Sequence, residues 1–408
     1  MSLAIPSTPV PYRRPPVDRL PPLDGLKVID FSRIFAGPLC TMTLGDFGAD
    51  VVKVESPAGD EARAFGPPWL GGEGMNFMAL NRNKRSVVLD LKHEQGREVA
   101  KRLCEHADVV IENFRPGVAE RLGIGYEQLA AANAGLIYCS VSGFGRLGPQ
   151  SDRPALDLVL QGAAGVMDRQ GGGVEPKLLV ITVADCYAAA LATQGILAAL
   201  LARARDGVGQ QLEVTLFQAL LAAQSYRIIS PATDPPELPA WQDVAPYQAF
   251  QTADGWITLA VVTDRSWQAF CSALELETLR DDARFATNPA RVEHQDELAA
   301  ALTPVLAAYL SEEALDRLAA AGVPSGRVQR VEDLFFDEHV LANGLIVEME
   351  HPTAGKVWTL GLPVQFAGTP GVIERPAPLL GEHTDEVLAE LGYDAGTITE
   401  IRSSGACG

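Results

Sequence analysis

Two short basic segments stand out because the chain around them is strongly acidic. Lys and Arg number 33 against 52 Asp and Glu, which gives a formal net charge of −19. Residues 80–86 hold three cations, and residues 112–117 hold Arg115 and precede Arg121. Because the protein as a whole is negative and repels anions, an anionic ligand would have to be held by such a local group of cations. Together the segments predict a site for an anionic ligand with an aromatic part, such as a nucleotide. A solvated cationic edge is the alternative interpretation.

A glycine-rich segment follows a predicted strand. Gly143, Gly145 and Gly148 match the pattern G-x-G-x-x-G. A dinucleotide-binding loop must also open a helix whose N-terminus meets the pyrophosphate. Pro149 and Pro154 argue against a helix directly after these glycines. We therefore expect either a plain turn or a loop whose backbone N–H groups face a ligand.

Asp185 directly precedes an alanine-rich helical pattern. Aspartate is among the residues that favour the N-cap of a helix, so a purely structural role is one interpretation. The other is a carboxylate at the mouth of a site, stabilised by the positive end of the helix. The two interpretations are compatible.

Short β-branched runs alternate with helical patterns through the first half of the chain, as in a mostly parallel sheet with helices on both faces. The expected strands are residues 25–31, 50–55, 86–91, 108–113 and 136–142. The expected helices are residues 37–47, 94–104 and 185–205. A hairpin with its turn at Asp254 and Gly255 begins a different rhythm. The predicted fold class is α/β, with a large Rossmann-like domain and a smaller α+β domain.

Proline content and the change of rhythm place the domain boundaries. Seven prolines in the first 22 residues predict an extended, solvated N-terminal arm. The large α/β domain is expected at residues 23–229 and the small domain at residues 230–330. Residues 331–408 are expected to return to the large domain.

Composition excludes several classes of protein. An acidic chain repels a phosphate backbone, so we expect no nucleic-acid partner. The six cysteines are scattered and the six histidines isolated, which predicts reduced thiols, a cytoplasmic location and no metal site. Residues 186–202 are too weakly apolar to span a bilayer, and the N-terminus lacks the apolar run of a signal peptide. We therefore expect no membrane association.

Taken as an ordered set, the motifs resemble those of the class III CoA-transferases, the family of formyl-CoA transferase, carnitine CoA-transferase and α-methylacyl-CoA racemase. The motifs are LDGLKVID from residue 23, AGP from 36, GADVVKVE from 48, NRNKR from 81, ENFRPG from 112, SGFG from 142, AD from 184, GVGQQ from 207, DG from 254, GVP from 322 and APLLGEHT from 377. They cover nearly all of the chain after the proline-rich arm.

The resemblance implies a site for CoA on the large domain, with acyl-CoA as a substrate and no tightly bound cofactor. The contacts carried over by position are Ile34, Phe35, Leu80, Asn81, Arg82, Asn83, Arg85, Asn113, Phe114, Arg115, Arg121, Gly143, Phe144 and Gly145. The 3′-phosphate and pyrophosphate of CoA suit arginine side chains and loop amides. Relatives often carry Arg where this chain has Ser56, so one contact is expected to be missing or supplied from elsewhere.

At Asp185 the resemblance implies the nucleophile of a CoA transfer from a donor acyl-CoA to an acceptor carboxylic acid. The implied intermediates are an aspartyl anhydride and an aspartyl-CoA thioester. The racemase branch instead pairs this carboxylate with a His just before Asp157, where this chain has Leu156. Leucine cannot exchange protons, which favours transfer over racemisation. A CoA-binding subunit without catalytic activity is the third possibility, and an intact Asp185 argues against it. The resemblance also implies an interlocked homodimer.

Overall fold

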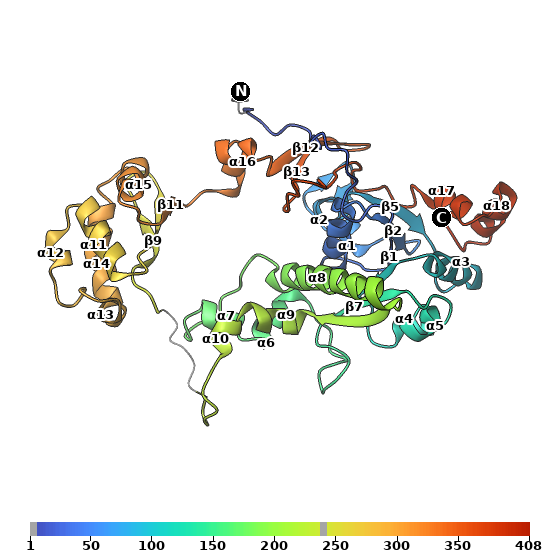
Figure 1. The fold of residues 1–408 in the computed structure, drawn as a ribbon, viewed down its shortest axis with the longest axis horizontal. Coiled ribbons are helices and arrows are strands. Elements are labelled where there is room, and N and C mark those ends of the chain that lie inside the picture. Colours follow the sequence, from blue (N-terminus) through green and yellow to red (C-terminus); the bar gives the residue numbers. More distant parts are fainter. Residues whose placement is uncertain (1–5, 237–242) are drawn as a thin grey trace. The chain divides into compact units, whose positions relative to one another are not determined.

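The computed structural model describes residues 6–236 and 243–408, and the chain divides into two compact units (Figure 1). Unit 1 comprises Met1–Ser225 together with Phe336–Gly408, and unit 2 comprises Tyr226–Phe335. Unit 2 is therefore an insertion in unit 1 along the chain.

The sequence predicts the limits of the smaller domain at residues 230 and 330, a few residues inside the limits of unit 2. The proline-rich connection that marks the first limit is only partly visible, because residues 237–242 lie outside the described residues.

Unit 1 is built on a six-stranded parallel sheet in the order β5-β2-β1-β6-β7-β8. The strands are β1 (Lys27–Asp30), β2 (Asp50–Glu55), β5 (Lys84–Val88), β6 (Val109–Glu112), β7 (Ile137–Ser142) and β8 (Gln210–Thr215). Apolar residues occupy both faces of the sheet. In β1, for example, Val28 belongs to the core cluster on one face and Ile29 to the cluster on the other. The strand order reverses between β1 and β6. The loops after these two strands therefore diverge at the carboxyl edge, where open α/β sheets bind ligands.

Helices cover both faces of the sheet, which confirms the predicted α/β layering. On one face lie α1 (Ala36–Asp46), α6 (Asp157–Ala163), α7 (Val166–Gln170), α8 (Val183–Asp206) and α9 (Leu216–Ala223). On the other lie α3 (Glu94–Glu105), α4 (Val118–Leu122), α5 (Tyr126–Ala130), α17 (Thr384–Glu390) and α18 (Ala395–Ser403). Helix α8 packs along α1 (Figure 1), and this contact brings the start of α8 to the carboxyl edge of the sheet.

Shorter elements complete unit 1. They are η1 (Glu61–Ala64), β3 (Trp69–Leu70), β4 (Glu73–Gly74), α2 (Met75–Leu80), α16 (Glu338–Ala342), β12 (Ile346–His351) and β13 (Gly355–Leu360). The N-terminal arm is docked on this region rather than solvated along its length. The Glu348 N–H donates to the Val10 carbonyl at 3.0 Å, and the Tyr12 hydroxyl donates to the Gly371 carbonyl at 2.9 Å. The arm is extended and most of its described residues are exposed, as expected, but its backbone and Tyr12 also find partners on the returning segment.

Unit 2 contains an antiparallel sheet in the order β11-β10-β9. Its elements are β9 (Tyr247–Gln251), β10 (Trp256–Ala260), α11 (Asp264–Ala273), α12 (Glu277–Arg280), α13 (Asn288–Glu293), α14 (Gln295–Leu306), α15 (Ser311–Ala320), β11 (Ser325–Arg327) and η2 (Val331–Phe335), with α10 (Ser225–Ile228) at the junction with unit 1. Strands β9 and β10 pair around the predicted turn, which confirms the hairpin. Trp267, Phe270 and Phe285 are fully buried in its core.

Helix α8 is the one single helix in the described ranges that is long and apolar enough to cross a membrane by length and hydropathy alone. Its residues Ala188, Ala192 and Ile196 are completely buried in the cluster between the sheet and α1. By hydropathy alone, the expectation that residues 186–202 are too weakly apolar to span a bilayer is therefore wrong, although the helix packs as a core helix of unit 1.

Candidate active site

A cavity of about 570 Å³ lies at the carboxyl edge of the parallel sheet, where the strand order reverses. Its wall includes Arg33, Ile34, Phe35, Asn113, Phe114, Arg115, Gly143, Arg153, Leu156 and Asp185. These residues come from the loops after β1, β6 and β7 and from the start of α8. The volume falls in the usual range for small-molecule sites. Segments that are far apart in the sequence thus meet at one site, as the predicted sheet requires.

Asp185 lies in the first turn of α8 and not at its N-cap, so the N-cap interpretation is wrong. The helix begins at Val183, and the cap position belongs to Thr182. The free N–H at this end is instead taken by Asp157, whose Oδ1 accepts from the Ala184 N–H at 2.7 Å. Because Asp157 performs the capping, the Asp185 carboxylate is left to line the cavity.

The ionisation of Asp185 is strongly perturbed. Burial, and then the negative charge of Asp157, raise the pKa of Asp185 to about 7, and a hydrogen bond from the Ala36 backbone N–H opposes this rise. Ala36 is the first residue of α1, so the positive ends of α1 and α8 both lie near the carboxylate. A perturbed carboxylate on the wall of a cavity is a characteristic of active sites.

Asn113 joins the loop after β6 to the loop after β1. Its Oδ1 accepts from the Arg33 N–H at 2.9 Å, and its Nδ2 donates to the Arg33 carbonyl at 2.7 Å. The Arg33 guanidinium pairs with Glu61 at 2.8 Å and lies 5.5 Å from the centre of the Phe114 ring. The predicted Asn113 is therefore joined to the loop after β1, whose predicted residues Ile34 and Phe35 line the same cavity.

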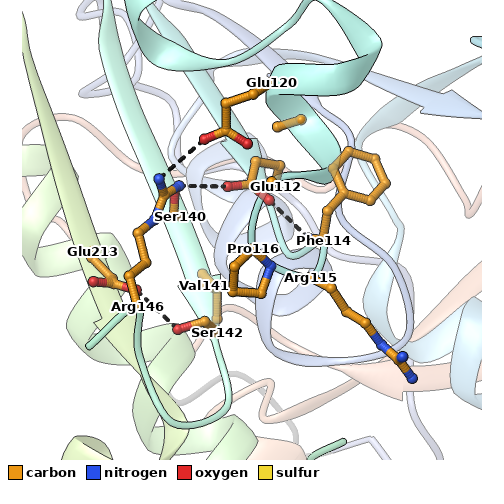
Figure 2. Close-up of a pocket in the computed structure, with 12 residues that line it drawn as sticks. Glu112, Phe114, Arg115, Pro116, Glu120, Ser140, Val141, Ser142, Arg146 and Glu213 are labelled. Carbon is orange, nitrogen blue, oxygen red and sulfur yellow. Dashed lines mark hydrogen bonds and ion pairs between the residues drawn. The ribbon is translucent and has the colours of Figure 1, made fainter. Parts of the chain in front are cut away.

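A smaller pocket adjoins the cavity at the ends of β6 and β7 (Figure 2). Arg146 spans it and pairs with Glu120 at 3.1 Å and with Glu112 at 3.8 Å. Burial raises the pKa of Glu112. Figure 2 shows Arg115 pointing away from this pair. Among the described residues, neither Arg115 nor Arg153 has a carboxylate within ion-pair distance, so both exposed cations remain available to an anion.

The glycine loop after β7 does not open a helix directly, as expected, since α6 begins only at Asp157. A Cβ atom on Gly143 would lie 2.2 Å from that of Ala155, so glycine is required for the loop to fold back on itself. Phe144 packs on Phe217 with ring centres 5.8 Å apart. Gly145 and Arg121 do not line the cavity.

The predicted contacts at residues 80–85 lie elsewhere. They precede or begin β5 and therefore lie at the amino edge of the sheet, opposite the cavity. Arg82 pairs with Asp46 and Arg85 with Asp50, each at 2.7 Å. Leu80, Asn81, Arg82 and Arg85 are buried, and Asn83 donates to Asp46. These cations are neither solvated nor free, and their assignment to CoA stays a prediction from the resemblance.

Sequence reasoning missed Arg33, Ala36 and Arg153, which all line the cavity. Ala36 acts through its backbone, and no residue type marks that role. Arg153 lies between Asp152 and Pro154 in an irregular segment, where neither periodicity nor spacing carries a signal. Only the fold places these residues beside the cavity.

Leu156 lines the cavity at the position that precedes Asp157. Its side chain is 63% exposed and apolar, so it offers no proton to a substrate held near Asp185. Of the carboxylate and histidine that the racemase branch pairs, only the carboxylate, Asp185, has a counterpart at these two positions of the cavity wall.

Comparisons with known proteins agree with this geometry. Residues 23–384 match the sequence model of "CoA-transferase family III". The chain is 34% identical over 398 residues to succinyl-CoA:glutarate CoA-transferase of Mus musculus, covering 95% of this chain and 91% of that protein. It is 37% identical over 391 residues to succinyl-CoA:mesaconate CoA-transferase of Haloarcula marismortui, covering 92% of this chain and 98% of that protein.

A solved structure of a CAIB/BAIF family protein from Brucella suis superposes with a TM-score of 0.80 and 38% sequence identity, covering 91% of this chain and all of that one. The match to the family runs from before β1 to the start of α17 and includes every segment that lines the cavity. The resemblance inferred from the motifs is thereby confirmed: the chain is a CoA-transferase and belongs to CoA-transferase family III.

Proposed function

We propose that this chain moves CoA from a donor acyl-CoA to an acceptor carboxylic acid, with Asp185 as a covalent nucleophile. The observation that carries the proposal is the half-buried Asp185 carboxylate on the wall of the cavity, hydrogen-bonded by the Ala36 N–H. A carboxylate is a weak nucleophile and depends on positioning. Burial that raises its pKa also makes the ionised form more basic and therefore more reactive.

Each step of the proposed reaction transfers an acyl group without water. An oxygen of Asp185 attacks the thioester carbonyl, the carbon–sulfur bond breaks, and an acyl–aspartyl anhydride and CoA thiolate form. The thiolate then attacks the aspartyl carbonyl and releases the donor acid, which leaves an aspartyl-CoA thioester. The acceptor carboxylate attacks this thioester, and the same two steps run in reverse. Backbone N–H groups at the starts of α1 and α8 are suited to stabilise the oxyanions.

For CoA we propose the cavity residues Ile34, Phe35, Asn113, Phe114, Arg115 and Gly143. Their loops converge at the strand reversal, and Arg115 has a free guanidinium for a phosphate. Arg121 follows the same strand and is proposed as a second phosphate contact. Residues 80–85 are left out of this proposal, because their cations are already paired.

For the acids we propose dicarboxylates. The relatives are named for succinyl-CoA with glutarate or mesaconate, all derived from dicarboxylic acids. One carboxylate of such an acid reacts, and the other needs a cation within the site. Arg153 is the cavity cation that neither pairs with a carboxylate nor belongs to the proposed CoA contacts, and we assign it to the distal carboxylate.

Asp185→Asn tests the nucleophile, since it removes the attacking anion and keeps the size of the side chain. We expect a folded variant that binds CoA and whose transfer rate is lower by several orders of magnitude. Wild type incubated with succinyl-CoA and then with hydroxylamine or borohydride should carry a mass change on the peptide that contains Asp185. Asp206→Asn, at the other end of the same helix, is the matched control and should retain full turnover.

Three outcomes contradict the proposal. Near-normal turnover of Asp185→Asn without an adduct on that peptide removes the covalent mechanism. Exchange of the Cα proton with solvent deuterium, without CoA transfer, indicates a racemase. Activity that appears only when a second family member is added indicates a binding subunit.

A further inference from the structure

A buried ion pair lies next to the proposed site and takes no part in the proposed chemistry. Lys53 on β2 and Asp60, which caps η1, approach to 2.9 Å, and both side chains are completely inaccessible to solvent. Neither residue lines the cavity. Removing two charges from water is costly, and such a pair is often no more stabilising than apolar residues of the same size. Its placement therefore calls for a role other than stability.

The pair holds the backbone of the loop between β1 and α1. The Lys53 ammonium donates to the Ser32 carbonyl at 2.8 Å. Asp60 accepts from the Ile34 N–H at 3.1 Å through Oδ1, the same oxygen that accepts from the Ala62 N–H at 2.9 Å. The two charges thus fix the peptide groups on either side of Arg33.

Between these contacts the chain adopts a strained conformation at Ile34. Its φ is +70°, in the left-handed region that β-branched residues avoid. Such a conformation costs about 1–3 kcal/mol and persists only where the surroundings over-determine it. Here Asp60 holds the Ile34 N–H, and Asn113 holds both polar groups of the preceding residue, Arg33.

The strained residue determines where the Ala36 N–H points. Ile34 turns the chain so that α1 begins two residues later, and Ala36 and Asp185 then line the same cavity. There the Ala36 N–H lowers the pKa of Asp185, which means that it favours the ionised carboxylate. If Ile34 relaxed out of the left-handed region, we expect that the start of α1 would turn away from Asp185. The position of this hydrogen bond is therefore set by contacts outside the cavity.

We propose that Asp60, locked by Lys53, is a positioning residue for Asp185. It holds Ile34 in the left-handed conformation and thereby keeps the Ala36 N–H on the carboxylate that reacts. This inference rests on the proposed function, since it takes the Asp185 carboxylate as the group that reacts.

The test removes both charges together. Asp30 and Glu55, the other acids that act on Lys53, keep their ion pairs with Lys84 at 3.0 Å and with Arg63 at 2.7 Å. Lys53→Met with Asp60→Ala should fold, with a melting temperature lowered by the loss of the Asp60 cap on η1. We expect kcat to fall about 10–100-fold, the scale of a misplaced reacting group, with the KM for succinyl-CoA nearly unchanged. We also expect the acid limb of kcat/KM to move to higher pH, because the Ala36 N–H favours the ionised form of Asp185. Asp157 and Cys186, the other titratable groups that interact with Asp185, are retained, so the shift reports this N–H.

Two further variants keep the test decisive. Ile34→Gly is added to the double variant, because glycine accepts a φ of +70° without strain. It should restore folding, kcat and the acid limb towards wild type, even if the double variant alone fails to fold. The matched control is Arg203→Met with Asp108→Asn, a half-buried pair with a 2.9 Å contact on unit 1, which should leave kcat and the acid limb unchanged.

The outcomes separate this inference from the proposed function. Unchanged kcat and acid limb in the double variant overturn the positioning role, while the adduct on Asp185 still stands. No recovery when Ile34→Gly is added to a defective double variant overturns it too. Loss of stability alone, to the same extent as in the control, also overturns it. Turnover in Asp185→Asn overturns the proposed function whatever the Asp60 variants do.

Discussion

The carboxyl group of Asp185 is destabilising in the folded chain whenever it is ionised. Its pKa is raised from an ordinary value of 3.8 to about 7, by burial and by the charge of Asp157. The folded state therefore binds a proton more tightly than the unfolded state does. Its contribution to stability is present below pH 4 and is lost as the pH rises towards 7, at up to about 1.4 kcal/mol per pH unit.

Asp185→Asn should therefore stabilise the fold at high pH, because asparagine carries no charge to bury. We expect the variant to melt above wild type at pH 8, and the difference to shrink at pH 5. Calorimetry at the two pH values measures this. A melting temperature difference that is the same at both pH values would contradict a raised pKa at Asp185.

The same titration governs activity. The nucleophile must be ionised, so kcat/KM should fall tenfold per pH unit below about pH 7 and level off above it. Initial rates between pH 5 and 9 with a fixed acyl-CoA donor provide the profile. A flat profile through pH 6 would mean that Asp185 is already fully ionised at that pH and that burial does not raise its pKa.

Arg153 provides a test of substrate class at the residue scale. Arg153→Gln should lower kcat/KM for glutarate by about 10–100-fold, the loss of a charge-assisted contact of 1.5–3 kcal/mol, and leave pentanoate unaffected. Arg115→Gln is the matched cavity control, and it should raise the KM for acyl-CoA equally with either acceptor. Equal losses for glutarate and pentanoate in Arg153→Gln would remove Arg153 from the distal carboxylate.

At the scale of elements, Arg85 joins three segments of unit 1. Its guanidinium pairs with Asp50 at the start of β2 and with Glu386 and Glu390 on α17, at 2.7–3.0 Å. Arg85→Ala should therefore destabilise the fold by about 1–3 kcal/mol, because it leaves three carboxylates facing one another.

The control for this prediction is Arg121→Ala, an exposed arginine on α4. It should leave the melting temperature unchanged and raise the KM for acyl-CoA. If Arg85→Ala raises the KM without a loss of stability, the amino edge of the sheet belongs to the CoA site after all.

The elements that sequence could predict are those with a strong internal pattern. β-branched runs and glycine or asparagine breaks define β1, β2, β6 and β7 to within a few residues. Helix α8 starts two residues earlier than predicted because its cap comes from Asp157, which is distant in sequence. Short helices such as α4 to α7 went unpredicted, because turns of this length are held by packing and carry too little periodicity of their own.

The candidate site was predictable only in part, for the same reason. Residues carried by motifs at strand ends, such as Asn113 and Gly143, reach the cavity because parallel strands share an edge. The basic run before β5 gives an equally strong signal in the sequence. Its cations point instead into the chain, towards acids that no local pattern pairs with them.

At the scale of the whole molecule, unit 1 exposes apolar side chains beside the proposed site. Val180 and Ile181, just before α8, are 91% and 74% exposed. Large apolar groups in such a position are characteristic of a surface that a partner covers. The homodimer, in which each chain passes through a ring formed by the other, stays a prediction from the resemblance.

An interlocked dimer cannot dissociate unless one chain opens. We therefore expect a dimer mass at nanomolar concentration in mass photometry, unchanged after prolonged dilution. A monomer population that grows with dilution would show that the two chains are not interlocked.

The insertion of unit 2 within unit 1 has a consequence for the timing of synthesis. Val387, Leu388 and Cys407 belong to the same core cluster as Val87 and Leu89, so the covering of this sheet face follows unit 2 along the chain. About 160 residues separate Ser225 from α17, which at roughly 5–20 residues per second amounts to about 8–30 s of translation. During that interval unit 2 can fold as a continuous segment, while the sheet face over β2 and β5 lacks the part of its cover that α17 and α18 supply. We expect the yield of active enzyme in a cell to depend on how well this half-covered sheet is shielded by chaperones, more than on the stability of the finished protein.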